Sequence, residues 1–249
     1  WAHFRTRKGA VKMHTLLDLR GSIPTFIHVS TGKVHDVTIL DTAPLEPDSI
    51  VTMDRAYLDF TRLYAIHRLP AFFVIRAKSN LRYRRLVSHK ADKAAGVRAD
   101  QVVALVGPRT KKAYPESLRR ISYYDATNDK RLVFLTNLFA VPAKTVANIY
   151  RQRWRVELFF KWIKQHLRIK AFFGTSANAV KTQIWIAIIA YLLVAIAKKK
   201  LNLPGNLYTI LQVLEVNVFE KRTIIQVVSD AFKQEHDAGD PNQLKLFNS

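Results

Sequence analysis

The stretch YRQRWRVELFFKWIKQHLR, residues 150–168, has the pattern of an amphipathic helix with one strongly basic face. At roughly 100° per residue, that face carries Tyr150, Arg153, Glu157, Lys161, Lys164 and Arg168 within an arc of about 80°. The opposite side carries Val156, Phe159, Ile163 and Leu167. Such a helix buries its apolar side and exposes its charged side. We therefore expect one long helix from about 143 to 168.

Glu157 is the single acidic residue among eight lysines and arginines between positions 144 and 170. Two explanations fit this isolation. Glu157 could form a surface ion pair with Lys161 or Arg153, four residues away on either side. It could instead be a metal-binding carboxylate among cations that hold phosphates, a combination that phosphodiester chemistry requires. The residues alone leave both explanations open.

The composition points to a polyanionic partner. Lys and Arg number 40 against 19 Asp and Glu in 249 residues, a net charge of +21. Nucleic acid is the simplest partner, and an anionic membrane surface is the alternative. The absence of cysteine excludes disulfides, cysteine-bound zinc and thiol nucleophiles. The apolar run at 184–197 is shorter than the 20 or so residues of a span, so we expect a core helix.

Hydrophobic periodicity predicts a mixed α/β chain. Alternation at 11–19 and 24–30 indicates a hairpin, and the apolar runs at 49–54 and 70–78 are typical of buried strands. The expected helices are 57–67, 178–200, 206–215 and 221–233, and short β-like runs fall at 101–107, 119–126 and 130–138. No Gly-rich phosphate loop is present, so we expect no nucleotide cofactor.

The spacing Tyr150-x2-Arg153-x3-Glu157-x6-Lys164 resembles the Tyr-Arg-Glu-Lys signature of DDE transposases from bacterial insertion sequences. MDRAYLDF at 53–60 is similar to that family's segment around its second catalytic aspartate. Residues 7–36 are similar to the stretch after its first catalytic strand. The resemblance extends over about 1–232. The function it implies is Mg²⁺-dependent phosphodiester hydrolysis and strand transfer at the ends of an insertion sequence.

The resemblance implies an α/β fold with a ribonuclease-H-like core. It also implies a β-rich insertion before the last catalytic helix, followed by a helical C-terminal part. On this basis we expect four parts. They are the first part of the core at 1–79, the insertion at 80–141, the core helix with the helical C-terminal part at 142–233, and a polar tail at 234–249.

The resemblance also implies the functional residues and partners. Asp54 and Glu157 would be the second and third catalytic carboxylates and would bind Mg²⁺ or Mn²⁺. DNA contacts are expected from Tyr150, Arg153 and Lys164 of the signature, from Lys161 and Arg168 of the basic face, and from Arg82 and Arg84. The partner would be double-stranded DNA, at element ends and target, bound by a homodimer. No membrane partner is expected, and the location would be the cytoplasm, at the nucleoid.

The first catalytic aspartate of the family has no clear counterpart. A ribonuclease-H-like core needs three strands before the one that ends at Asp54, and only 11–19 and 24–30 are present. The resemblance puts the missing strand before Trp1, so we expect an N-terminally truncated chain that does not cleave DNA by itself. Asp18 is expected to be a strand-end residue beside a turn, and Trp154 to pack. A non-catalytic, DNA-binding remnant of a transposase remains the alternative function.

Overall fold

The computed structural model describes residues 3–5, 8–9, 11–167, 169, 171–217 and 219–237. Its contacts divide the chain into two compact units. The first unit comprises residues 1–16 and 26–157, and the second comprises 17–25 and 158–249. The expected boundaries at 79/80 and 141/142 fall inside the first unit. Residues 238–249 of the expected polar tail lie outside the described residues.

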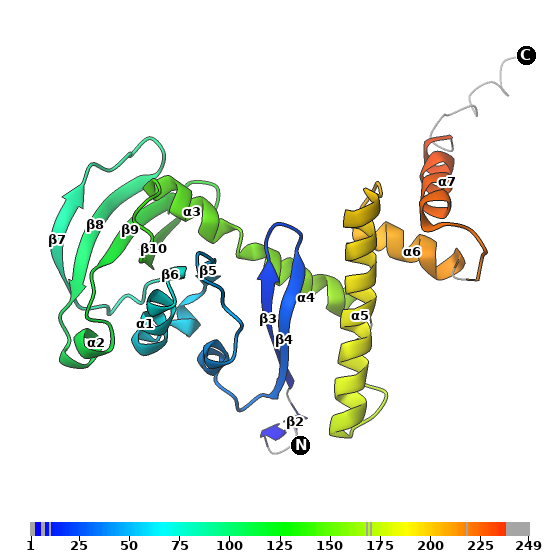
Figure 1. Cartoon of the computed structure of the whole chain (residues 1–249), viewed down its shortest axis with the longest axis horizontal. Helices are drawn as coiled ribbons and strands as arrows, with labels where there is room; N and C mark the ends of the chain where they lie inside the picture. Colours follow the sequence, from blue (N-terminus) through cyan, green and yellow to red (C-terminus); the bar gives the residue numbers. More distant parts are fainter. Residues whose placement is uncertain are drawn as a thin grey trace, which may run out of the picture. The chain divides into compact units, whose positions relative to one another are not determined.

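The first unit is built on a six-stranded sheet in the order β5-β6-β10-β9-β8-β7 (Figure 1). The strands are β5 (Ile50–Met53), β6 (Phe72–Arg76), β7 (Tyr83–His89), β8 (Val97–Leu105), β9 (Leu118–Asp125) and β10 (Lys130–Thr136). Strands β5 and β6 run parallel, and every other neighbouring pair is antiparallel. Strand β5 lies at one edge of the sheet. Strands β3 (Val11–Asp18) and β4 (Ile23–Thr31) form a separate hairpin, as do β1 (His3–Arg5) and β2 (Lys8–Gly9).

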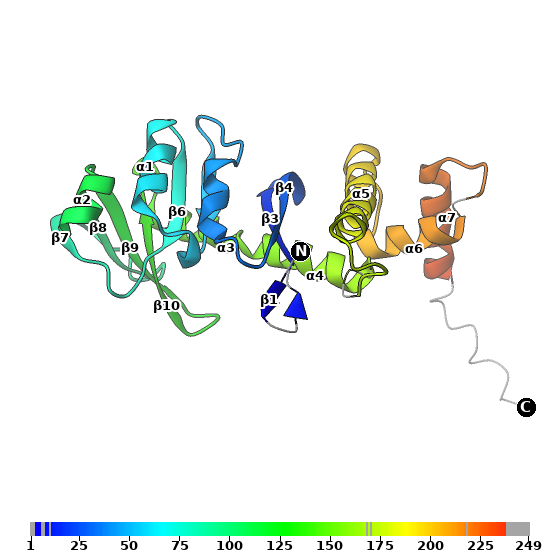
Figure 2. The ribbon, with the colours of Figure 1, turned by 90° about the horizontal axis from the view of Figure 1, so that it is seen from below.

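Helices cover both faces of this sheet (Figures 1 and 2). They are the 3₁₀ helices η1 (Asp36–Asp41) and η2 (Arg55–Tyr57) and the α-helices α1 (Phe60–Arg68), α2 (Pro108–Ala113) and α3 (Ala143–Arg151). Along β6 the side chains alternate, so Phe73 and Ile75 pack with Leu63 of α1 while Val74 packs with Val146 of α3. The central strands of the sheet are thus buried between α1 on one face and α3 on the other.

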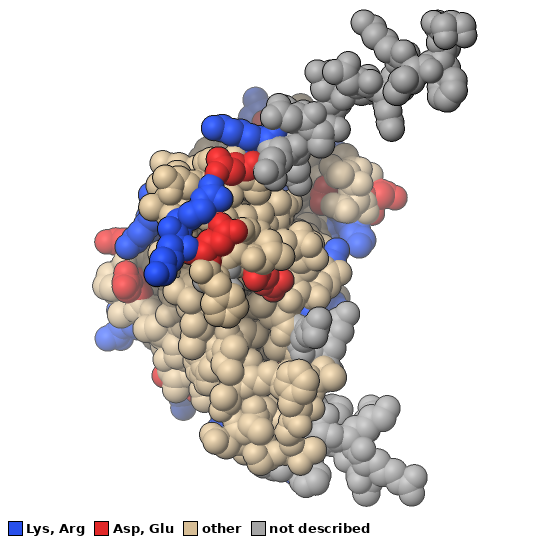
Figure 3. Space-filling model, turned by 90° about the vertical axis from the view of Figure 1, so that its right-hand side faces the viewer, with Lys and Arg blue, Asp and Glu red and all other residues tan. Residues whose placement is uncertain are grey.

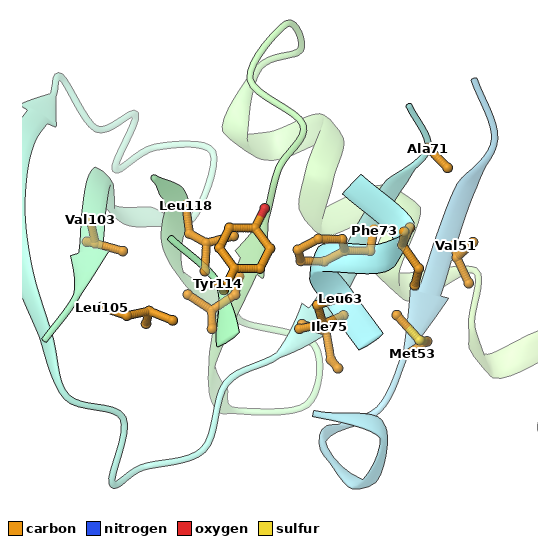
Figure 4. Packing of buried hydrophobic residues seen from close by; sticks show 12 residues of the cluster. Val51, Met53, Leu63, Ala71, Phe73, Ile75, Val103, Leu105, Tyr114 and Leu118 are labelled. Carbon is orange, nitrogen blue, oxygen red and sulfur yellow. The ribbon is translucent and has the colours of Figure 1, made fainter. Parts of the chain in front are cut away.

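The larger core cluster lies on the α1 side (Figure 4). Tyr114, which follows α2, is fully buried there, and its ring meets that of Phe73 edge-on with the ring centroids 6.2 Å apart. The Tyr114 hydroxyl is 2.8 Å from Nδ1 of His67, so its polar end is satisfied. A side chain from the 80–141 segment therefore completes the core of the strands that precede it.

Most elements predicted from periodicity are present within a few residues of their expected bounds. The hairpin at 11–19 and 24–30, the strands at 49–54 and 70–78 and the helix at 57–67 correspond to β3, β4, β5, β6 and α1. Between positions 80 and 141 the structure adds β7 and α2, which the sequence did not predict. Strand β10 pairs directly with β6, so this segment extends the main sheet. The mixed α/β class is confirmed.

The single helix expected at 143–168 is wrong. The chain forms α3 and then α4 (Trp154–His166), with a tightened turn at Gln152 and Arg153. There, backbone N–H groups bond to carbonyls three residues back, as in Arg153 N–H to Tyr150 O (3.0 Å) and Val156 N–H to Arg153 O (3.1 Å). This is 3₁₀ geometry, which often marks a functional position inside a helix. No Gly or Pro in the sequence announces it.

The second unit is helical. Besides most of α4 it contains α5 (Ala177–Leu201), α6 (Leu207–Asn217) and α7 (Ile224–Asp237). Ser176 caps the start of α5 by accepting the Ala179 N–H, and Asn202 ends it in the left-handed conformation. The buried Tyr191 of α5 donates its hydroxyl hydrogen to the Ser22 carbonyl at 2.7 Å, which anchors the β3–β4 turn. This anchor explains why residues 17–25 belong to the second unit.

Helix α5 meets the length and composition of a membrane span, with a mean hydropathy of 2.0 and 39% of that window buried within the chain. Seven of its side chains are buried, whereas Trp185, Ile186, Ile189 and Leu193 are exposed, so the helix is only partly buried within the chain. From the side of α6 and α7, charged residues gather in one area and uncharged residues cover most of the remaining surface (Figure 3). The charged area contains residues of both signs.

Candidate active site

Asp54 follows the last residue of β5, at the carboxyl end of a parallel strand. Its carboxylate accepts the backbone N–H of Ala56 at 2.7 Å, which caps η2 and fixes the orientation of the side chain. The buried residues Val51 and Met53 hold the strand in the core. The sequence thus places a half-buried, oriented carboxylate at a strand end, where functional groups of α/β folds commonly lie.

Glu157 and Arg153 form the second part of the site. Arg153 Nη2 donates to Glu157 Oε1 at 2.6 Å, and their side chains are 25% and 42% exposed. The Arg153 guanidinium also lies 5.8 Å from the centroid of the Tyr150 ring. Of the two partners considered for Glu157, the structure selects Arg153. Tyr150, Arg153 and Glu157 therefore form one contiguous group across the tightened turn.

Electrostatics connect this group to Asp54. Burial by itself would lower the pKa of Arg153, but the hydrogen bond to Glu157 and the charges of Tyr150, Glu157 and Asp54 together raise it. Burial raises the pKa of Tyr150, opposed by the nearby charges of Arg153 and Arg76. Arg153 thus stays protonated between two carboxylates, and the Tyr150 hydroxyl stays a neutral hydrogen-bonding group.

Arg153 also has an unsatisfied donor. Its Nε is buried and has no hydrogen-bond partner within the described part of the chain. A buried guanidinium N–H without an acceptor costs free energy. The Arg153 side chain as a whole is 25% exposed, so its accessible part can donate to an anionic group while Nη2 holds Glu157.

A further acidic group flanks Asp54. Burial raises the pKa of Tyr57 to about 12, and the negative charges of Asp36 and Asp54 add to this rise. Asp36 forms an ion pair with Lys12 at 3.1 Å and lies 3.9 Å from Nδ1 of the buried His14. No side-chain cap bond is observed at the start of η1, and Asp36 pairs with Lys12, whose Nζ also donates to the Val34 carbonyl at 2.8 Å.

The remaining expected DNA-binding residues are distributed over both units. Lys161 and Lys164 are exposed on α4, and Arg82 and Arg84 are exposed at the start of β7. None of these four has a carboxylate partner among the described residues. Arg168 lies outside the described residues. Trp154 was expected to pack, and this is wrong, because its side chain is 57% exposed on the outer side of the turn.

Asp18 has a structural role. Its Oδ1 accepts the backbone N–H of Arg20 at 3.0 Å, and the Arg20 Nε lies 3.4 Å away. This hydrogen bond from the Arg20 backbone, with help from the Arg20 and Lys199 charges, lowers the pKa of Asp18. These contacts stabilise the turn between β3 and β4, as expected for a strand-end residue.

The donor set of the candidate site fits a hard divalent cation. Carboxylate oxygens are preferred ligands of Mg²⁺ and Mn²⁺, and Mg²⁺ is commonly bound through one or two carboxylates with substrate phosphates. Asp54 and Glu157 can supply such oxygens, and Asp54 uses one of its two oxygens in the η2 cap. Within the described part of the chain no three acidic or histidine side chains are grouped closely enough to form a complete site.

A basic pocket next to the site was missed by the sequence. It has a volume of about 330 Å³, and its cationic lining residues are Arg55, Arg76, Lys78, Arg120 and Arg131. Arg76 and Lys78 belong to a basic run visible in the sequence. Arg120 and Arg131 lie more than 40 positions later, on β9 and β10. Only the pairing of β10 with β6 brings them together, so no local signal could have revealed the pocket.

Comparison with known proteins gives consistent similarities. The sequence model of the family described as transposase DDE domain matches residues 2–193. A Sinorhizobium fredii protein named as a transposase is 33% identical over 234 residues, covering 91% of this chain and 64% of that protein. A Geobacillus stearothermophilus protein, named for a transposase of insertion sequence element IS5377, is 32% identical over 195 residues, 78% of this chain and 51% of its own length. The chain thus spans about half to two thirds of these relatives.

Proposed function

Because the chain belongs to the family of transposase DDE domains, we propose that it is the catalytic part of an insertion-sequence transposase. The proposed reactions are divalent-metal-dependent hydrolysis of phosphodiesters at the element ends and strand transfer into target DNA. The observation that carries the proposal is the position of Arg153, paired with Glu157 at 2.6 Å and electrostatically coupled to Asp54. One guanidinium thus pairs with one of the two carboxylates that the signature predicts to be catalytic and is affected by the charge of the other.

Asp54 and Glu157 would hold the metal, Mg²⁺ or Mn²⁺. When bound, such a metal activates a water or a 3′-hydroxyl and stabilises the leaving oxygen in an in-line displacement. The η2 cap keeps Asp54 oriented before any metal arrives. Arg153 limits the repulsion between the carboxylates. The exposed part of its guanidinium would donate to a phosphate oxygen of the bound strand.

A third carboxylate would come from a strand beside β5. Strand β5 is an edge strand, and the hairpin β3–β4 is a separate sheet in the described structure. An additional strand hydrogen-bonded to β5 would present a side chain next to Asp54, since adjacent strands lie about 4.8 Å apart. The matched relatives contain residues beyond the region that aligns with this chain. We propose that such a segment provides the first catalytic aspartate.

The DNA contacts follow from exposure and charge. Lys161 and Lys164 on α4 and Arg82 and Arg84 on β7 would bind phosphates of double-stranded DNA, with Arg168 as a further candidate. Tyr150 and Arg153 would contact the strand nearest the carboxylates. A homodimer on paired element ends and a cytoplasmic, nucleoid-associated location complete the proposal.

A Mn²⁺ titration of the 249-residue chain, followed by electron paramagnetic resonance, tests the metal site without requiring a DNA substrate. Asp54→Asn and Glu157→Gln should each weaken Mn²⁺ binding at least about tenfold, the order expected for loss of one charged ligand. Glu46→Gln, an exposed carboxylate in the loop before β5, is the matched control and should not change the affinity. Equal Mn²⁺ binding by all four proteins would refute the assignment.

Cleavage assays separate the proposal from its alternative. We expect no Mg²⁺-dependent cleavage of DNA by the 249-residue chain alone, because the first carboxylate would be missing. Cleavage that is abolished by Asp18→Ala would instead assign that carboxylate to Asp18. DNA binding without any Mn²⁺ site at Asp54 and Glu157 would favour the non-catalytic remnant.

A further inference from the structure

The basic pocket beside Asp54 gathers positive charge in a concave site. Its cations are Arg55, Arg76, Lys78, Arg120 and Arg131, and no carboxylate lines it. None of the five forms an ion pair with a described residue. Positive charges that line one pocket repel one another, so an anionic ligand bound there would be favoured.

The pocket is connected to the candidate active site on two sides. Arg55 directly follows Asp54 and begins η2, whose cap is the Asp54 carboxylate. Arg76 ends β6 and lies near enough to Tyr150 for its charge to counteract the rise in the Tyr150 pKa. A group bound in the pocket therefore lies next to the residues proposed to act on the phosphodiester.

Part of the pocket is preorganised. The Arg120 guanidinium lies 5.0 Å from the centroid of the Tyr83 ring, and its Nη1 donates to Gln101 Oε1 at 3.1 Å. Arg120 on β9 is paired with Leu135 of β10, and Val133 and Arg131 follow at alternate positions of β10, so all four share one face of the sheet. An arginine held by stacking and a hydrogen bond loses less entropy on binding a phosphate than a free one.

The shape and charge together favour a chain end over a continuous strand. The volume of about 330 Å³ is at the small end of ligand pockets and suits one phosphate with its sugar. An internal phosphodiester carries one negative charge, whereas a terminal phosphate carries between about 1.5 and 2 at neutral pH. A pocket lined by five cations and no carboxylate favours the more highly charged group.

We propose that this pocket binds the 5′-phosphate end of a cleaved DNA strand. The inference rests on the proposed function, which generates such an end. When water attacks the phosphorus, a new P–O bond forms and the P–O3′ bond breaks. The 3′-oxygen takes up a proton and leaves as a hydroxyl, and the phosphate stays on the 5′ side of the other fragment. The pocket would retain that fragment next to Asp54 after hydrolysis.

The test compares two 3′-fluorescein-labelled hexathymidylates, one with a 5′-phosphate and one with a 5′-hydroxyl, by fluorescence anisotropy at fixed salt and without metal. The phosphorylated strand should bind at least about tenfold more tightly. Arg120→Gln/Arg131→Gln should reduce this ratio to below about threefold. The single variant Arg131→Gln changes an exposed side chain and guards against misfolding of the double variant; it should reduce the ratio at least twofold.

Lys111→Gln/Lys112→Gln is the matched control, since it removes two exposed positive charges from α2 outside the pocket. It should weaken both strands equally and leave the ratio unchanged. Equal binding of the two strands, or a ratio that falls equally in the control, would overturn the proposal. A ratio unaffected by Arg120→Gln/Arg131→Gln would do so as well.

Inorganic phosphate distinguishes a DNA end from free phosphate. Millimolar phosphate should compete with the phosphorylated strand only weakly, because it lacks the sugar and the following nucleotides. Competition at the same concentration as the phosphorylated strand would mean a free-phosphate site and would overturn the assignment to DNA. The Mn²⁺ titration reports on Asp54 and Glu157 independently, so failure of the catalytic proposal and failure of this one give different results.

Discussion

Among single substitutions in the first unit, loss of the Arg119 side chain is predicted to lower the free energy of unfolding the most. Its Nη2 and Nε bind the two oxygens of Asp100 at 2.8 and 2.9 Å, and both side chains are only 8% exposed. The same guanidinium donates to the carbonyls of Leu138, Phe139 and Val141, the last at 2.6 Å. It therefore fixes the segment between β10 and α3.

Replacing Arg119 by Met leaves Asp100 buried without its partner and three carbonyls without a donor. Breaking a buried ion pair in this way costs about 3–5 kcal/mol. For a chain of this size each kcal/mol shifts Tm by about 2–4 °C, so the Tm should fall by roughly 6–20 °C. Urea unfolding followed by far-UV circular dichroism, with amide exchange of β8–β10, measures the loss in the first unit.

A double-mutant cycle makes the reasoning refutable. Asp100→Asn combined with Arg119→Met removes both charges of the buried pair. The double variant should therefore lose less unfolding free energy than the two single variants lose in total. A coupling free energy of about 1–3 kcal/mol is expected for groups in direct contact. An Arg119→Met loss below about 1 kcal/mol, or strictly additive losses, would show that the pair does not hold the β10–α3 segment as argued.

Three further predictions concern other parts of the chain. Burial raises the pKa of Tyr191 to about 12, so the stability that the neutral hydroxyl contributes is complete below pH 10 and is lost as the pH rises towards 12. At pH 8, Tyr191→Phe should lower the free energy of unfolding by about 1 kcal/mol, because the hydrogen bond to Ser22 is lost. Near pH 11.5 the variant should resist alkaline denaturation better than the wild type. Burial lowers the pKa of His14 below 6.5, with His28 and Lys12 acting in the same direction and Asp36 opposing it. The stability that neutral His14 contributes to the first unit is therefore present above pH 6.5 and is lost as the pH falls. In urea unfolding between pH 7 and 5, His14→Gln should make the first unit less sensitive to acid. Lys161→Gln/Lys164→Gln should reduce the slope of log K against log salt for duplex DNA by about 1.8, or 0.9 per lost phosphate contact; an unchanged slope would remove these lysines from the interface.

Elements with strong local patterns could be predicted from the sequence. The hairpin of β3 and β4 follows from alternation around a turn, and α5 from a long apolar run closed by Ser176 and Asn202. Strand β7 could not be predicted in this way. It lies at the sheet edge with six of its seven residues exposed, so its sequence carries charges and no apolar alternation.

The site was predictable to the extent that its residues are close in sequence. Tyr150, Arg153 and Glu157 lie within eight positions, and their contact follows from helical spacing. The link to Asp54 and the basic pocket depend on strand pairing between distant segments, as in Ala77 N–H to Val133 O at 2.8 Å. Such pairing is fixed by register and core packing, which a local pattern does not determine.

The break between α3 and α4 improves the contact that the spacing predicted. On an uninterrupted α-helix, residues three apart are offset by about 60° around the axis, which would separate Arg153 from the Tyr150 ring. In 3₁₀ geometry side chains three apart eclipse one another, and the Arg153 N–H to Tyr150 O bond of 3.0 Å creates that geometry. The guanidinium is thereby brought to 5.8 Å from the ring centroid. Regular helix resumes at Trp154 and carries Glu157 one turn beyond Arg153, where the two pair at 2.6 Å. The same tightened turn therefore serves both contacts of Arg153, which explains how a motif inferred on a straight helix is preserved on a broken one.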